Sequence, residues 1–132
     1  MRTFATSIIS ACLLAYAAVV QAIELDGAWA NDLSACTKVF VKQGNRISLS
    51  KDSDMYGSGF VIEADRIRGK IATCTIKSRK ADGAVLHMVA TCSDDVALQS
   101  VQFSIKSEGE NTITRIFHGL PELDTRYHRC SF

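Results

Sequence analysis

The chain has 132 residues, with 15 basic and 14 acidic side chains and a formal net charge of +1. This balance argues against the basic surface of a nucleic-acid-binding protein and against a solvating acidic tail. With 47% hydrophobic residues, the chain is long enough to bury one modest core.

The first 22 residues have the order of a cleavable export signal. Arg2 gives a basic start, residues 8–20 are apolar apart from one serine, and Ala22 ends a small-residue cleavage site. The apolar run is too short to span about 30 Å of hydrocarbon comfortably, acidic Glu24 closes it, and no later segment is long and apolar enough to span. We therefore predict cleavage after Ala22, one mature domain of residues 23–132, and a periplasmic or secreted location.

Cysteines follow the predicted signal in an even number: Cys36, Cys74, Cys92 and Cys130. In a small exported domain, such a set predicts two disulfides and no free thiol. The fifth, Cys12, lies inside the signal. Cys12 and Cys36 each stand at the last position of a short motif that resembles a lipidation box. The residues around each motif do not fit a lipidation signal.

Hydrophobic and polar residues alternate along most of the mature chain, which is typical of half-buried strands. Clear alternation occurs over residues 46–50, 86–92, 101–105 and 113–117, and turn residues such as Asp82-Gly83 separate the runs. About eight short antiparallel strands result. They predict an all-β fold, a small up-and-down barrel, with a β-sandwich as the alternative. A barrel is favoured because successive strands pair in turn and closure removes exposed edges.

The strand pattern also bears on the disulfide pairing. Residue 83 is the midpoint between Cys74 and Cys92, so a three-residue turn after Ala81 would place these two cysteines opposite each other. We therefore prefer Cys74–Cys92, which leaves Cys36–Cys130 to join the first and last strands at the barrel seam. Directly opposed cross-strand disulfides are somewhat strained. The alternative, Cys36–Cys74 with Cys92–Cys130, therefore stays open.

The mature chain opens with Leu25-Asp26-Gly27-Ala28-Trp29. This string resembles the Gly-x-Trp opening of lipocalin-like and avidin-like small barrels, including bacterial protease-inhibitor barrels, in which a cysteine follows as Cys36 does. The resemblance implies that Trp29 begins the first strand and plugs one end of the barrel. Packing alone also makes Trp29 a core anchor. Three later arginines are candidates for stacking on the indole: Arg115, Arg126 and Arg129.

Catalytic patterns are absent from the sequence. The histidines His87, His118 and His128 are scattered, and His87 alternates with Leu86 and Met88, so it is expected to face solvent. There is no Gly-x-Ser-x-Gly elbow and no Cys-x-x-Cys zinc spacing. We therefore predict a protein that is not an enzyme and needs no metal or cofactor.

One string partly matches a calcium loop of the EF-hand type. Asp52, Asp54 and Glu63 stand at ligand positions, but Tyr56 occupies a position where a short oxygen-bearing side chain is needed, and neither flank looks helical. We interpret this stretch as a solvated loop between strands rather than a metal site.

Residues 51–59 form a connection that is long for a hairpin, and they supply the candidate binding residues Met55, Tyr56 and Ser58. Loops on rigid barrels often carry binding, and exposed aromatic and methionine side chains are enriched in interfaces. Tyr56, Ser58 and Gly59 also resemble, in a different order, the Ser-Gly loop and tyrosine of periplasmic lysozyme inhibitors.

We therefore predict an exported, non-enzymatic binding protein that uses its barrel loops, with a lysozyme or protease as the partner it inhibits. The alternatives are a lipocalin-like binder of small molecules and a cell-envelope structural or stress protein without a specific ligand. The volume of the barrel interior distinguishes these classes, because a fully packed interior leaves only the loops for binding.

Overall fold

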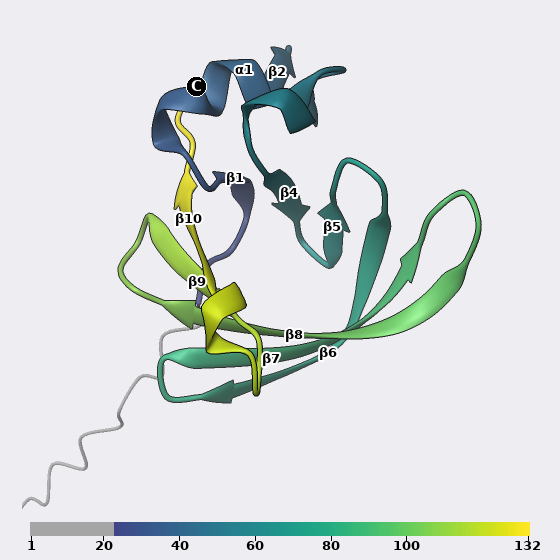
Figure 1. The fold of residues 1–132 in the computed structure, drawn as a ribbon, viewed down its shortest axis with the longest axis vertical. Helices are drawn as coiled ribbons and strands as arrows, with labels where there is room; N and C mark the ends of the chain where they lie inside the picture. Colours follow the sequence, from purple (N-terminus) through teal and green to yellow (C-terminus); the bar gives the residue numbers. More distant parts are fainter. Residues whose placement is uncertain (1–22) are drawn as a thin grey trace, which may run out of the picture.

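Eight strands of the computed structural model close into an antiparallel barrel (Figure 1). They are β1 (Gly27–Ala30), β4 (Gly59–Glu63), β5 (Arg66–Arg68), β6 (Thr73–Asp82), β7 (Val85–Ser93), β8 (Leu98–Ser107), β9 (Thr112–Ile116) and β10 (Thr125–Arg129). From β4 to β10 each strand pairs with the next, and β1 closes the ring by pairing with both β4 and β10. The predicted up-and-down barrel is confirmed. The structure describes residues 23–132, so the predicted signal peptide lies outside the described residues.

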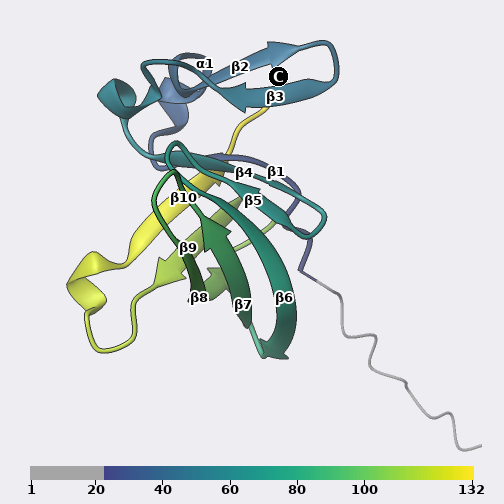
Figure 2. The same ribbon diagram turned by 90° about the vertical axis from the view of Figure 1, so that its right-hand side faces the viewer.

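An inserted segment, residues 31–58, separates β1 from β4. It contains the 3-10 helix η1 (Leu33–Ala35), the helix α1 (Cys36–Val39), the strands β2 (Phe40–Gln43) and β3 (Arg46–Leu49), and the 3-10 helix η2 (Ser53–Tyr56). Strands β2 and β3 form a separate hairpin outside the barrel (Figure 2). The alternation over residues 46–50 therefore corresponds to a strand, β3, but the hairpin that it forms with β2 contributes no strands to the barrel.

The inserted segment packs on the outer face of β1 and β4. Ala28 and Ala30 of β1 are small and fully buried there, against Val39 and Phe40 of the insertion. Gly59 has the same role in β4, because a Cβ at this position would lie 2.8 Å from Val39 Cγ1 and 2.9 Å from Phe40 Cζ. Small residues on this side of the barrel thus allow a second layer to approach closely.

The barrel interior is filled over most of its length by inward-facing side chains. Trp29 is completely buried, and its Nε1 donates a hydrogen bond of 2.8 Å to the carbonyl oxygen of Leu25. Alternate residues of β7, including Leu86 and Met88, are buried as the two-residue period predicts. Burial of these side chains supplies the main stabilisation of the fold.

Both preferred disulfides are present: Cys36–Cys130 and Cys74–Cys92. Cys74 and Cys92 are register partners in β6 and β7, but the predicted turn was wrong. The turn contains two residues, since Asp82 pairs with Val85, and a β-bulge between Ile76 and Ser78 then shifts the register by one residue. The bulge restores the Cys74–Cys92 pairing, which we had predicted from a three-residue turn.

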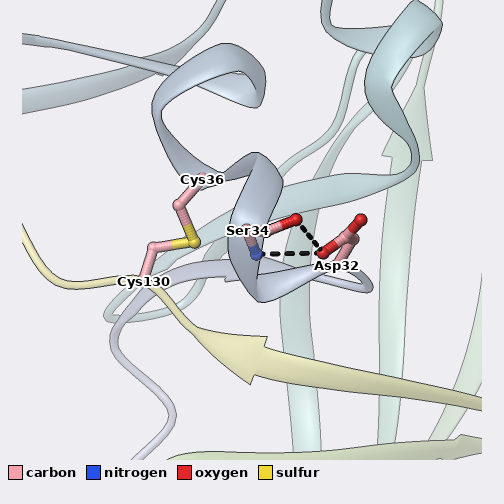
Figure 3. Close-up of a disulfide and its surroundings, with 4 residues drawn as sticks. All are labelled: Asp32, Ser34, Cys36 and Cys130. Atoms are coloured by element: carbon pink, nitrogen blue, oxygen red, sulfur yellow. Dashed lines mark hydrogen bonds between the residues drawn. A yellow bond between two sulfur atoms is a disulfide. The ribbon is translucent and has the colours of Figure 1, made fainter.

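The predicted place of the second disulfide also needs correction. Cys36 lies in α1 of the inserted segment, not in the first strand, and Cys130 follows β10 (Figure 3). Upstream, the carboxylate of Asp32 accepts hydrogen bonds from Ser34 N and Ser34 Oγ, at 2.9 and 2.7 Å, and so caps η1. The bridge therefore fastens the inserted segment to the chain end rather than joining two strands at the seam.

Candidate binding site at the barrel mouth

One end of the barrel is closed. The guanidinium of Arg129 lies 4.4 Å from the centroid of the Trp29 ring, so Arg129 is the one of the three candidate arginines that stacks on the indole. Its N–H groups also donate to the backbone oxygens of Glu24, at 2.9 Å, of Glu110, at 3.2 Å, and of Asp26. These bonds hold the segment before β1 across this end of the barrel.

The opposite end contains a cavity of about 260 Å³ between the packed core and the rim. We call it the mouth pocket. Its walls are inward-facing side chains of successive strands: Phe60, Ile67, Met88, Phe103, Arg115 and Tyr127. The volume is slightly below the range of about 300–1,000 Å³ that is common for ligand pockets. The pocket is therefore suited to a small ligand.

Arg115 provides the only charged side chain among the residues that line the mouth pocket. It lies in β9 beside Ile105 of β8 and Thr125 of β10. Its guanidinium lies 4.7 Å from the ring centroid of Phe103 and 4.5 Å from that of Phe117. Burial lowers the pKa of Arg115, and the nearby Tyr127 acts in the opposite direction.

Ser58 is the predicted binding residue that reaches the mouth pocket. It lies just before β4, lines the pocket, and its Oγ is 3.5 Å from the hydroxyl oxygen of Tyr127. The Tyr127 ring packs edge-on against Phe60, with the ring centroids 4.8 Å apart. Two hydroxyl groups and one guanidinium thus stand in an otherwise apolar cavity.

Met55 and Tyr56, the other predicted binding residues, lie outside the pocket on η2. Met55 is 75% exposed, and Tyr56 is exposed beneath the Lys38 ammonium, which lies 5.1 Å from its ring centroid. Lys70 of the β5–β6 loop donates to the backbone oxygens of Ser50, at 3.2 Å, and Lys51. The loop and the η2 segment are thereby joined into one part of the rim.

Further apolar side chains are exposed in the loops of the same barrel end. Ile71 in the β5–β6 loop is 82% exposed, and Val96 in the β7–β8 loop is 93% exposed. Leu98 begins β8, and Leu120 and Leu123 belong to the β9–β10 loop; all three are exposed. In an up-and-down barrel, the β5–β6, β7–β8 and β9–β10 connections lie at the same end as the start of β4. None of these exposed side chains was predicted from the sequence as a binding candidate.

The calcium-like string does not form a loop around a common point. Glu63, its final candidate ligand, lies in β4, where its carboxylate forms an ion pair of 3.0 Å with Arg68. Within residues 23–132 there is no cluster of three or more His, Cys, Asp or Glu side chains that could hold a metal ion.

Two of the scattered histidines meet on the outer face of the barrel. His87 Nδ1 and His118 Nε2 each lie 2.8 Å from Ser104 Oγ, and the Asp82 carboxylate lies 3.8 Å from His87 Nε2. His87 is therefore partly covered rather than free in solvent. The sequence did not reveal this cluster, because its members come from β6, β7, β8 and the segment after β9. Ser104 is itself buried beneath the rings.

Comparison of the chain with protein-family models, with curated proteins and with solved structures finds no match. The resemblance of the Gly27-to-Trp29 opening to lipocalin-like barrels therefore stays a prediction from the sequence. In the part of the chain that the structure describes, no helix is long and apolar enough to cross a membrane. The mouth pocket and its rim are therefore the features of the molecule from which we infer a function.

Proposed function

We propose that this protein is an exported, non-enzymatic binding protein that holds a small apolar molecule in the mouth pocket. The observation that carries the proposal is the cavity of about 260 Å³ inside an otherwise filled barrel. A concave, mainly apolar cavity with a few convergent polar groups is the usual form of a small-molecule site.

The closed end gives the pocket a single entrance. Trp29 and Arg129 occupy the far end of the barrel, so a ligand enters and leaves between the rim loops. The Cys74–Cys92 disulfide joins two adjacent strands, and Cys74 lines the pocket. A wall fastened in this way is preorganised, which reduces the entropy lost on binding.

Two matched variants test the pocket. Ala72 lines the cavity, so Ala72→Phe is expected to fill it, whereas Ala97→Phe places the same side chain in the β7–β8 loop, away from the lining. Binding of the neutral probe 4-phenylbutanol is measured by calorimetry. Saturable binding to wild type and Ala97→Phe, with loss in a folded Ala72→Phe variant, supports the proposal. Equal binding by all three proteins, or by none, contradicts it.

A second candidate function is inhibition of a lysozyme or protease through the rim. The specific observation that favours it is the exposure of Met55, Ile71 and Val96 in three neighbouring connections. Clustered exposed apolar side chains often mark protein interfaces. A pull-down against lysozymes and proteases identifies the partner, and Met55→Ala combined with Tyr56→Ala then weakens the complex. Unchanged affinity in the folded double variant would remove these residues from the interface.

A further inference from the structure

We propose that the mouth pocket selects small apolar molecules that carry a carboxylate, and that Arg115 binds this head group. The inference rests on the proposed function, since it names the ligand class of the same pocket. Arg115 is then the residue that determines specificity within an otherwise apolar cavity.

Arg115 has no acidic partner and no side-chain hydrogen bond in the part of the chain described. The ion pairs among residues 23–132 involve Arg68, Lys70, His87 and Arg126, and the side-chain hydrogen bonds that other arginines form have no counterpart at Arg115. A partly desolvated cation without a partner is costly to the fold. A carboxylate ligand would offset that cost with two parallel N–H···O bonds.

The aromatic neighbours leave the hydrogen-bonding capacity of Arg115 unused. The Phe103 and Phe117 rings lie 4.7 and 4.5 Å from the guanidinium and stabilise its charge through their π faces. Phenylalanine offers no strong acceptor, so the N–H groups of the guanidinium remain available to a ligand. The rings also restrict the position of the guanidinium, which favours recognition of a planar head group.

The rest of the pocket disfavours cationic ligands. No acidic residue lines the cavity, so a cationic ligand would meet Arg115 without compensation. Tyr127 and Ser58 supply neutral hydroxyl groups near the entrance, 3.5 Å apart, which suit a second polar contact. Below them, Met88 and Ile105 form an apolar floor. A carboxylate at Arg115 with a short apolar body directed toward this floor fits the arrangement.

The test compares two probes that share one apolar body, 4-phenylbutyrate and 4-phenylbutanol, by calorimetry. Wild type is expected to bind the acid roughly tenfold or more tightly than the alcohol, since charge-assisted hydrogen bonds are stronger than neutral ones. Arg115→Met is expected to remove this preference, because it weakens binding of the acid far more than binding of the alcohol. Arg126→Met is the matched control, because Arg126 pairs with Glu108 on the exposed surface, at 3.1 Å, and does not line the pocket.

The outcomes separate this inference from the proposed function. If wild type binds the alcohol at least as tightly as the acid, the carboxylate inference is wrong and the pocket proposal survives. If neither probe binds, both are wrong. If Arg115→Met fails to fold, the wild-type comparison at low and high salt still decides, since only a charge-assisted preference for the acid weakens with salt.

Discussion

The guanidinium of Arg129 stacks on the Trp29 ring at 4.4 Å and, at the same time, binds backbone oxygens of the segment before β1. One side chain from the last strand thus closes the barrel end where the first strand begins. Within residues 23–132, the mouth pocket lies at the end of the barrel opposite this closure.

The first prediction concerns this closure. Arg129→Met keeps an unbranched side chain over Trp29 but leaves the backbone oxygens of Glu24 and Glu110 without their donor. We expect the free energy of unfolding to fall by about 1–3 kcal/mol, because hydrogen bonds from charged donors have about that value. Urea denaturation measures the change. Arg126→Met, on the surface, is expected to cost less than about 1 kcal/mol. Equal losses in the two variants would contradict a closing role for Arg129.

The second prediction concerns the contact between the barrel and the inserted segment. Gly59→Ala would place a Cβ 2.8 Å from Val39 Cγ1 and 3.0 Å from the Trp29 backbone oxygen. We expect a loss of about 1–3 kcal/mol from overpacking. Gly69→Ala is the control, since its nearest neighbour, the Ala72 backbone oxygen, would lie 3.4 Å away. Similar denaturation midpoints for the two variants would show that the close approach at Gly59 is unimportant.

The third prediction ranks the disulfides. Cys36–Cys130 spans 94 residues of sequence and Cys74–Cys92 spans 18. In the chain-entropy model, the first stabilises by about 4–5 kcal/mol at most and the second by about 3 kcal/mol. Replacing Cys36 and Cys130 together by serine should therefore destabilise more than replacing Cys74 and Cys92 together. Chemical denaturation of the two double variants gives the order, and the reverse order would contradict the ranking.

Much of this fold could be predicted from the sequence because its signals are local. The alternation of residues in β7 and β8 identifies both strands and their buried faces. The spacing of Cys74 and Cys92 predicted the correct bridge from an incorrect turn, because a β-bulge compensates for the shorter turn. The β2–β3 hairpin shows the limit. Its alternation predicts paired strands, but nothing local says that the hairpin packs outside the barrel on Ala28 and Ala30.

The candidate site could be predicted less well from the sequence, because its residues come together only through the pairing of strands. Ser58 was predicted as a loop residue, and its place at the mouth follows only from how β4 enters the barrel. Arg115 was considered only as a partner for Trp29, because its contacts with Phe103 and Phe117 depend on the register of β8 and β9. The meeting of His87 with His118 depends on the same kind of cross-strand information.

The fourth prediction concerns acid. Hydrogen bonds from Ser34 Oγ and then Ser34 N hold the pKa of Asp32 below its ordinary value of 3.8. A carboxyl group with a depressed folded-state pKa stabilises above the unfolded value, and this contribution is lost as the pH falls through the folded value. Asp32→Asn should therefore lose less stability than wild type when the pH falls from neutral to below 3.8.

Urea denaturation of both proteins at neutral and acid pH checks this expectation. Asp94 has its pKa lowered in the same way, by hydrogen bonds from Val96 N and Ala97 N, so Asp32→Asn should reduce the acid loss without abolishing it. Identical pH dependence in Asp32→Asn and wild type would mean that the η1 cap contributes nothing through its charge.

The place where a small acid binds tests the assignment of the binding site most directly. 4-Phenylbutyrate is titrated into the protein, and amide chemical shifts are followed by nuclear magnetic resonance. We expect saturable shifts at the mouth pocket, centred on Phe103, Arg115 and Tyr127, with little change around Gly83 and Glu110 at the closed end. No saturable shift, or shifts centred on the closed end, would contradict the claim that the open mouth of the barrel is the binding site.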